Sequence, residues 1–130
     1  MDQINTQTSV PKNMAIYVKL LAIEHYGELN VMYTDVLIKF LSISPWKANP
    51  PLPWRMAKVH SPAFNKGKLG SDASWVPMNM MLPAKLVNDI KAELILINST
   101  SEKNVSLRTF LYTAIFWWCT YVMPSKKSGL

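Results

Sequence analysis

A short sequence phrase occurs twice in this chain, and this repeat constrains the fold more than any other feature. Residues 10–14 read Val-Pro-Lys-Asn-Met, and residues 82–86 read Leu-Pro-Ala-Lys-Leu. When the two prolines are aligned, an Asn-Val phrase also recurs, at 30–31 and at 104–105, with only two extra residues in the second copy. One half-unit built twice in a single chain predicts an internal pseudo-dimer, because neither half is large enough to bury a core alone.

The residues before each proline alternate in polarity, which is typical of a half-buried strand. Residues 5–10 place Thr and Val on one side and Asn, Gln and Ser on the other, and residues 76–82 place Val, Met and Leu on one side. Each proline is then expected at the first position of a helix, where its missing N–H is not needed. We therefore expect two short strands that run directly into helices. For residues 5–9, a polar N-terminal tail is the alternative interpretation.

Apolar residues at helical spacing follow each proline, and a second helical pattern follows each Asn-Val phrase. Ser106 is expected to cap the last helix. Met32 stands in the equivalent position of the first copy and cannot cap a helix, so Asn30 or Thr34 must replace it. The predicted fold is mainly α with a two-stranded antiparallel β ribbon. The apolar stripes expected to share one core are Met14, Ile16, Val18, Leu21, Ala22 and Ile23; Leu86, Val87, Ile90, Leu94 and Ile97; Val36, Leu37, Phe40 and Leu41; and Leu111, Ala114, Ile115 and Trp118.

The chain of 130 residues is long enough for one compact domain. The repeats divide it into a first half at 5–43, a connector at 44–74, a second half at 75–123 and a tail at 124–130. The connector is rich in proline and in basic residues, a composition typical of an extended spacer. Its aromatic residues Trp46, Trp54 and Phe64 are unusual for a disordered linker, so we expect it to wrap the surface with those rings docked.

The net charge of +6 is unevenly distributed. Residues 1–41 carry three lysines and four acidic residues, whereas all the other basic residues follow. Such a field favours a polyanion, either nucleic acid or an anionic membrane surface. The single cysteine, Cys119, lies in an apolar helical run and is expected to be a buried hydrophobe in a reducing compartment. The start lacks signal-peptide features, and the apolar run at 110–123 is shorter than the ~20 residues of a membrane span. We therefore expect a cytoplasmic protein.

The order of strand, proline, helix, Asn-x-Ser turn and helix resembles the ribbon-helix-helix family of DNA-binding proteins. The run at 106–115, Ser-Leu-Arg-Thr-Phe-Leu-Tyr-Thr-Ala-Ile, is similar to the opening of that family's second helix, with Asn104 where the family usually has glycine. A fused tandem more closely resembles the accessory proteins of the virulence C operon of tumour-inducing plasmids, which assist T-DNA transfer, and related factors of conjugative transfer origins. The resemblance implies a pseudo-dimeric ribbon-helix-helix monomer that binds double-stranded DNA, with a relaxase or another transfer-complex protein as a candidate second partner.

By this resemblance, the ribbon enters the major groove and reads bases with its outward side chains. Asn and Gln pair with adenine edges, and Met81 is suited to a thymine methyl group. Pro77 departs from the polar pattern. Because the two half-ribbons differ, the preferred DNA site is expected to be asymmetric. The base-reading residues implied are Asn5, Gln7, Ser9, Asn79 and Met81.

The resemblance also implies that phosphates bind where the second helix of each copy starts, because backbone N–H groups are free there. These groups are expected at 31–33 and at 105–107. Solubilising surface charge is the alternative interpretation for each basic residue. The side chains expected at phosphates are Lys12, Lys58, Lys66, Lys68, Lys85, Lys103, Ser106 and Arg108.

No catalytic chemistry is expected. His25 and His60 have no cysteine or carboxylate at metal-ligand spacing, and no glycine-rich phosphate loop or nucleophile motif occurs. We therefore predict no metal, no cofactor and no small-molecule substrate. The leading hypothesis is a DNA-binding accessory protein of conjugative plasmid or T-DNA transfer. A transcriptional repressor with the same ribbon is one alternative, and a helical protein-interaction or membrane-peripheral module that uses the Trp-rich last helix is another.

Overall fold

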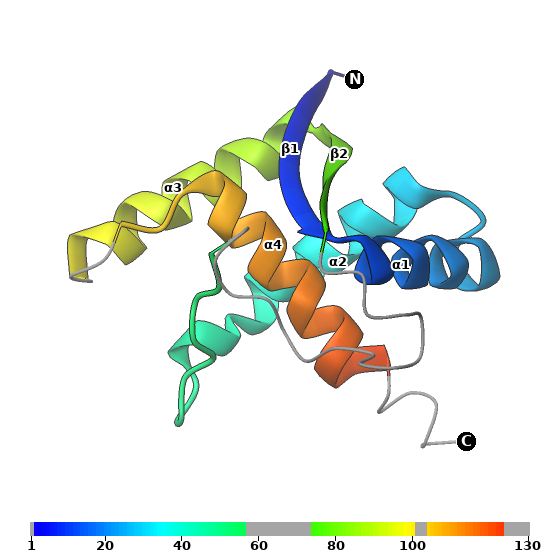
Figure 1. Cartoon of the computed structure of the whole chain (residues 1–130). Coiled ribbons are helices and arrows are strands. Elements are labelled where there is room, and N and C mark those ends of the chain that lie inside the picture. The colour runs from blue at the N-terminus through cyan, green and yellow to red at the C-terminus, as the bar shows by residue number, and fades with distance from the viewer. Residues whose placement is uncertain (1, 57–73, 101–103, 124–130) are drawn as a thin grey trace.

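A two-stranded antiparallel ribbon lies between helices that come from both halves of the chain (Figure 1). The computed structural model describes residues 2–56, 74–100 and 104–123. These segments are mainly helical, as the sequence pattern predicted. Their elements are β1 (Gln3–Pro11), α1 (Lys12–His25), α2 (Leu29–Ile43), a 3-10 turn (Pro45–Lys47), β2 (Trp75–Pro83), α3 (Ala84–Thr100), α4 (Leu107–Trp117) and a π-helical turn (Trp118–Val122). No helix in these segments has both the length and the apolar character needed to cross a bilayer.

The ribbon has a register that matches the sequence repeat. Gln7 lies opposite Asn79, and these two residues are also equivalent when the prolines of the two copies are aligned. The same alignment makes the backbone hydrogen bonds at the two ends of the ribbon equivalent, because each donor is the residue after the aligned proline. The N–H of Lys12 donates to the carbonyl of Ser74 over 2.8 Å, and the N–H of Ala84 donates to the carbonyl of Asp2 over 3.0 Å. The predicted antiparallel pairing of the two strands is therefore confirmed.

Each strand runs into its helix without a loop, as expected, but the prolines occupy a different position. Pro11 is the last residue of β1 and the N-cap of α1, with φ −58° and ψ 143°. Pro83 ends β2, and α3 starts at Ala84. The prediction of a first helical position was therefore wrong by one residue. The fixed φ of proline suits an extended residue as well as a helical one, so the same side chain closes the strand.

The turn between α1 and α2 is shorter than its counterpart in the second copy. Gly27 adopts φ +78°, a conformation that glycine accepts without steric cost. Glu28 is extended and α2 begins at Leu29, so this helix starts a full turn earlier, relative to the repeat, than α4 does. The N-cap is Glu28, and its side chain makes no capping hydrogen bond. The prediction that Asn30 or Thr34 caps this helix was therefore wrong.

The turn between α3 and α4 is held by side-chain hydrogen bonds. The amide of Asn98 accepts from the N–H of Val105 over 2.6 Å and donates to the carbonyl of the same residue over 3.0 Å. Ser106 is the N-cap of α4, and its hydroxyl oxygen accepts from the N–H of Thr109 over 3.1 Å. The predicted Ser106 cap is confirmed.

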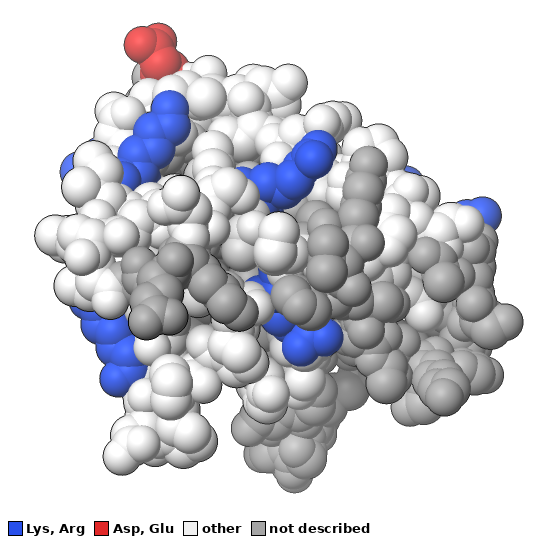
Figure 2. Space-filling model, turned by 60° about the vertical axis from the view of Figure 1, so that its left-hand side comes forward, with Lys and Arg blue, Asp and Glu red and all other residues white. Residues whose placement is uncertain are grey.

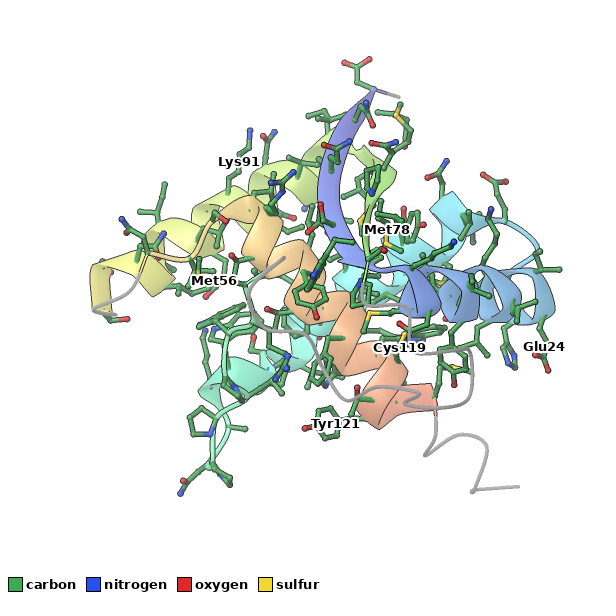
Figure 3. All side chains as sticks on the ribbon, in the orientation of Figure 1. Glu24, Met56, Met78, Lys91, Cys119 and Tyr121 are labelled. Carbon is green, nitrogen blue, oxygen red and sulfur yellow. The ribbon has the colours of Figure 1, made fainter. Side chains whose placement is uncertain are left out.

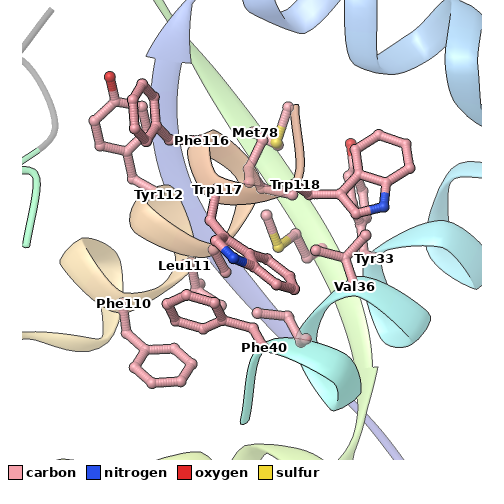
Figure 4. Close-up of a cluster of buried hydrophobic side chains, with 14 of the residues drawn as sticks. Tyr33, Val36, Phe40, Met78, Phe110, Leu111, Tyr112, Phe116, Trp117 and Trp118 are labelled. Carbon is pink, nitrogen blue, oxygen red and sulfur yellow. The ribbon is translucent and has the colours of Figure 1, made fainter. Parts of the chain in front are cut away.

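The core forms where α2 and α4 cross beneath the buried face of the ribbon (Figure 4). Phe40 of α2 is fully buried, and its ring centroid lies 5.1 Å from that of Phe110 and 5.3 Å from that of Trp117. The ribbon contributes Met78, Met80 and Leu82 to the same cluster. Of the predicted stripes, Ile16 and Ile23 are exposed and Leu41 is only partly buried. The remaining members are buried: Met14, Val18, Leu21, Ala22, Val36, Leu37, Phe40, Leu86, Val87, Ile90, Leu94, Ile97, Leu111, Ala114, Ile115 and Trp118.

The first part of the connector docks on this core, as its aromatic residues predicted. Trp46 stacks near Phe40 at 5.1 Å and near Trp54 at 5.3 Å between ring centroids. The Arg55 guanidinium lies 4.2 Å from the centre of the Phe116 ring, a cation–π geometry. Phe64 lies outside the described residues. The docked rings join α2 to α4 and so reinforce the contact between the two halves.

Candidate nucleic-acid interface

The outward face of the ribbon carries the row of side chains that the sequence assigned to it, with one exception. Asn5, Gln7 and Asn79 are exposed, Pro77 is also exposed, and Met81 is 38% exposed. Ser9 is only 3% exposed. Residues 8–11 are all buried, so both faces of β1 are covered at this end. Ser9 was therefore wrongly expected to be available for a base contact.

The centre of the ribbon face is an amide pair. Gln7 Nε2 donates a hydrogen bond of 2.8 Å to Asn79 Oδ1. This bond orients the two side chains while the Gln7 carbonyl oxygen and the Asn79 amide nitrogen remain able to bind other groups. The amide of an Asn or Gln side chain can bind the adenine edge with its donor and its acceptor together.

The opposite, buried face of the ribbon contains two threonines whose hydroxyl groups are both hydrogen-bonded. Thr6 is 7% exposed, and its hydroxyl donates to the Met80 carbonyl over 3.0 Å. Thr8 is fully buried, and its hydroxyl donates to the Arg108 carbonyl over 2.8 Å. A buried hydroxyl needs such a partner. The Thr8 bond also fixes the first turn of α4 against β1, a role that the sequence analysis did not assign to Thr8.

The start of α4 therefore lies beside the ribbon. Arg108 and Ser106 are exposed there. The N–H of Val105 donates to Asn98, so it is not available to an anion and the predicted site at 105–107 loses one of its three donors. The N–H of Thr109, farther along the first turn, donates to Ser106. The first-turn residues Leu107 and Arg108 have backbone N–H groups that a helix leaves without internal partners.

The start of α2 lies beside the other end of the ribbon and has different chemistry. The Asn30 side-chain oxygen accepts from the N–H of Met81 over 3.2 Å, so this residue joins α2 to β2. The N–H of Met32 donates to the Glu28 carbonyl over 3.3 Å. The first-turn N–H groups are therefore those of 29–31. Of the predicted range 31–33 only Val31 belongs to them, because the helix begins earlier.

A hollow of about 660 Å³ lies between this end of the ribbon and α2. Its rim includes the carboxylates of Glu28 and Asp35 and the apolar side chains of Val31, Ile38 and Met81. Asp35 is held by Lys39 Nζ at 2.9 Å and by the Tyr26 hydroxyl at 2.7 Å. Burial and the hydrogen bond to Asp35 raise the pKa of Tyr26 to about 12, so this phenol remains a neutral donor.

The lysines at the helix starts are exposed. Lys12 is the first residue of α1, and Lys85 follows Ala84 at the start of α3. Lys85 Nζ lies 2.9 Å from Asp89 Oδ2, an exposed pair one helical turn apart that contributes little to stability. In the view of Figure 2, Lys and Arg side chains are spread over the face, and acidic side chains appear only at its top edge. The predicted phosphate residues Lys58, Lys66, Lys68 and Lys103 lie outside the described residues.

The described cysteine, histidine and carboxylate side chains away from the ribbon do not form a common site, and Figure 3 labels two of them, Cys119 and Glu24. Cys119 is buried in the core, and burial raises the pKa of its thiol well above the usual range. His25 lies at the exposed end of α1 with Nε2 4.0 Å from Glu24 Oε1. Among the described residues, no three His, Cys, Asp or Glu side chains gather as metal ligands would.

One further residue belongs to the outward face of β1, although it was not among the predicted base-reading residues. Gln3 begins β1, is exposed, and lies on the same side of the strand as Asn5 and Gln7. The period-two pattern extends to it, and only the assumed start of the strand excluded it.

Comparison with protein-family models, with curated proteins and with solved structures finds no match to this chain.

Proposed function

We propose that this chain is a DNA-binding protein that inserts its β ribbon into the major groove, as ribbon-helix-helix proteins do. The observation that carries the proposal is the exposed amide row of Asn5, Gln7 and Asn79 along the outward face of a two-stranded ribbon. A ribbon of this width fits the major groove, where each base pair presents a distinct pattern of donors and acceptors.

The proposal includes a pseudo-dimer within one chain. The coincidence of the repeat alignment with the strand register supports it, because Gln7 and Asn79 are both paired and equivalent. The equivalent hydrogen bonds of Lys12 to Ser74 and of Ala84 to Asp2 support it further. A core shared by α2 and α4 gives each half the apolar surface that it lacks alone. One chain then supplies what a homodimer supplies in most ribbon-helix-helix proteins.

Affinity comes mainly from the phosphate backbone in this proposal. The Thr8 hydroxyl binds the backbone carbonyl of Arg108, which holds the start of α4 against the buried side of the ribbon, and the Arg108 side chain is exposed. In this proposal the Arg108 side chain reaches a phosphate beside the groove that the ribbon enters. The net charge of +6 supplies long-range attraction. Binding is expected to weaken steeply as salt rises, because each phosphate contact releases condensed counterions.

The finer role that we propose is that of an accessory factor in conjugative plasmid or T-DNA transfer. It rests on the fused tandem arrangement and on the sequence resemblance of residues 106–115. The location of the bound DNA tests this role. A preferred site beside a nicking origin supports it, and a site that overlaps a promoter supports repression instead.

The DNA-binding proposal is tested by removing the central amides. A preferred duplex is first selected from a random pool with the full chain, and the dissociation constants for this duplex and for a shuffled one are measured by fluorescence anisotropy. The double variant Gln7→Ala/Asn79→Ala is expected to lower the ratio of the two constants about tenfold, because one good amide-to-base contact discriminates by ~1–3 kcal/mol. Affinity for the shuffled duplex is expected to change less than twofold.

Asn88→Ala is the matched control, because it removes an exposed amide from α3 and leaves the ribbon intact. Equal loss of affinity for both duplexes in the double variant would contradict base reading by the ribbon. A wild-type chain that binds no duplex at low salt would remove the proposal altogether.

A further inference from the structure

We infer that the two ends of the ribbon have different roles in DNA binding: one end reads bases, and the other holds the phosphate backbone. The reading end is formed by Gln3, Asn5 and Met81, and the holding end by Pro77 and Arg108. This inference rests on the proposed function and specifies which half of the DNA target carries sequence information. The central pair of Gln7 and Asn79 separates the two ends.

The reading end combines two kinds of exposed chemistry. Asn5 lies directly opposite Met81 in the ribbon, and Gln3 follows Asn5 along the same face. An amide donates to and accepts from the adenine edge, and a flexible thioether packs on the thymine methyl group. The half-site under this end is therefore rich in A·T pairs.

The holding end lacks the groups that base reading needs. Ser9 is 3% exposed, and its partner Pro77 has no side-chain donor or acceptor. What this end does present is the exposed cation of Arg108, whose backbone carbonyl is bonded to the Thr8 hydroxyl. An exposed guanidinium in the first turn of α4 suits a phosphate oxygen, which carries no sequence information.

The acidic side chains beside the start of α2 oppose a similar hold at the reading end, and the lysine of this end, Lys85, is paired with Asp89 at 2.9 Å. Glu28 and Asp35 border the hollow that adjoins Gln3 and Met81. Lys39 offsets the charge of Asp35, whereas the Glu28 carboxylate has no ion pair among the described residues. A carboxylate at this position repels a phosphate that approaches the start of α2. Sequence information and backbone affinity thus come from opposite ends.

The test uses the full chain and the selected duplex. Each base pair is substituted in turn and the affinity is measured by anisotropy, and ethylation interference identifies the phosphates that are contacted. We expect the sensitive base pairs to lie at the centre and in one A·T-rich half, and the sensitive phosphates to lie mainly in the other half. Asn5→Ala should lower the base preference in the informative half about tenfold, whereas Ser9→Ala should leave all base preferences unchanged.

Two charge variants complete the test. Arg108→Ala should remove ethylation interference in the uninformative half and weaken all sequences equally, with Lys47→Ala as the control that changes net charge by the same amount from the 3-10 turn. Glu28→Gln should strengthen binding to all sequences severalfold. A site with equal information in both halves would overturn the inference while DNA binding stands, as would effects of Asn5→Ala and Arg108→Ala in the same half. A chain that binds no duplex refutes the proposed function itself.

Discussion

The variant Phe40→Ala tests whether the two halves of the chain share one core. Phe40 belongs to the first copy and is fully buried, and the rings around it come from the second copy and from the connector. Their centroids lie between 5.1 and 6.3 Å from that of Phe40. Truncation of a buried Phe to Ala costs ~3–5 kcal/mol, and aromatic pairs at such distances add to the loss. We expect the upper part of this range, about 4–5 kcal/mol.

This loss is a large part of the ~5–15 kcal/mol that stabilises a typical domain. With a urea dependence of ~2 kcal/mol per molar, the unfolding midpoint should fall by roughly 2 M. Far-UV circular dichroism measures the transition without relying on the tryptophans that contact the mutated site. Ile95→Ala is the control, because this α3 side chain is 72% exposed and its removal should cost less than about 0.5 kcal/mol. A loss below about 1 kcal/mol for Phe40→Ala would refute the shared core.

Three further predictions concern single residues. Ser106→Ala removes the hydroxyl that accepts from Thr109, so we expect a loss of about 1 kcal/mol in urea unfolding, and no loss would show that the cap is not needed. Burial raises the pKa of Tyr33 to about 12, so the unfolded phenol ionises near its ordinary value of about 10 before the folded one does. The contribution of Tyr33 to stability is therefore complete below pH ~10 and is lost as pH rises toward 12, and the fall should be smaller in Tyr33→Phe; an equal fall in both proteins would assign it to other groups. Burial also raises the pKa of the Cys119 thiol, so a thiol reagent should label it only in denaturant, and rapid labelling of the native chain would contradict its burial.

The elements of the fold could be predicted because each has a local signal. The alternation at 5–10 and 76–82 indicated the strands, and the two prolines indicated where strands become helices. The repeat added the long-range information that local patterns lack, because it implied that the two strands are equivalent and must pair. The Ser106 cap was predictable for the same local reason.

The errors arose where tertiary packing overrides a local pattern. Alternation assigned Ser9 to the outward face, but the end of β1 is covered on both sides. The start of α2 depends on the conformation of Gly27 and Glu28, and the aligned repeat pointed to a later residue. The alternation assigned Thr8 to the buried face but gave it no specific contact. The sequence cannot show that the Arg108 carbonyl lies within hydrogen-bond distance of its hydroxyl.

The outward chemistry of the ribbon was largely predictable, whereas its unequal ends were only partly so. The differing strand sequences already implied an asymmetric site. That Glu28 and Asp35 adjoin Met81 while Arg108 adjoins Thr8 follows from helix positions that no local pattern fixes. The electrostatic contrast between the ends is therefore a property of the folded chain.

Insertion of the ribbon into DNA is tested most directly by nuclear magnetic resonance of the labelled full chain with its selected duplex. The side-chain amide signals of Asn5, Gln7 and Asn79 should shift strongly on binding, while the amide signal of Asn88 on α3 remains in place. Shifts confined to the helices, with the three ribbon amides unchanged in a saturated complex, would show that the chain meets DNA through another surface.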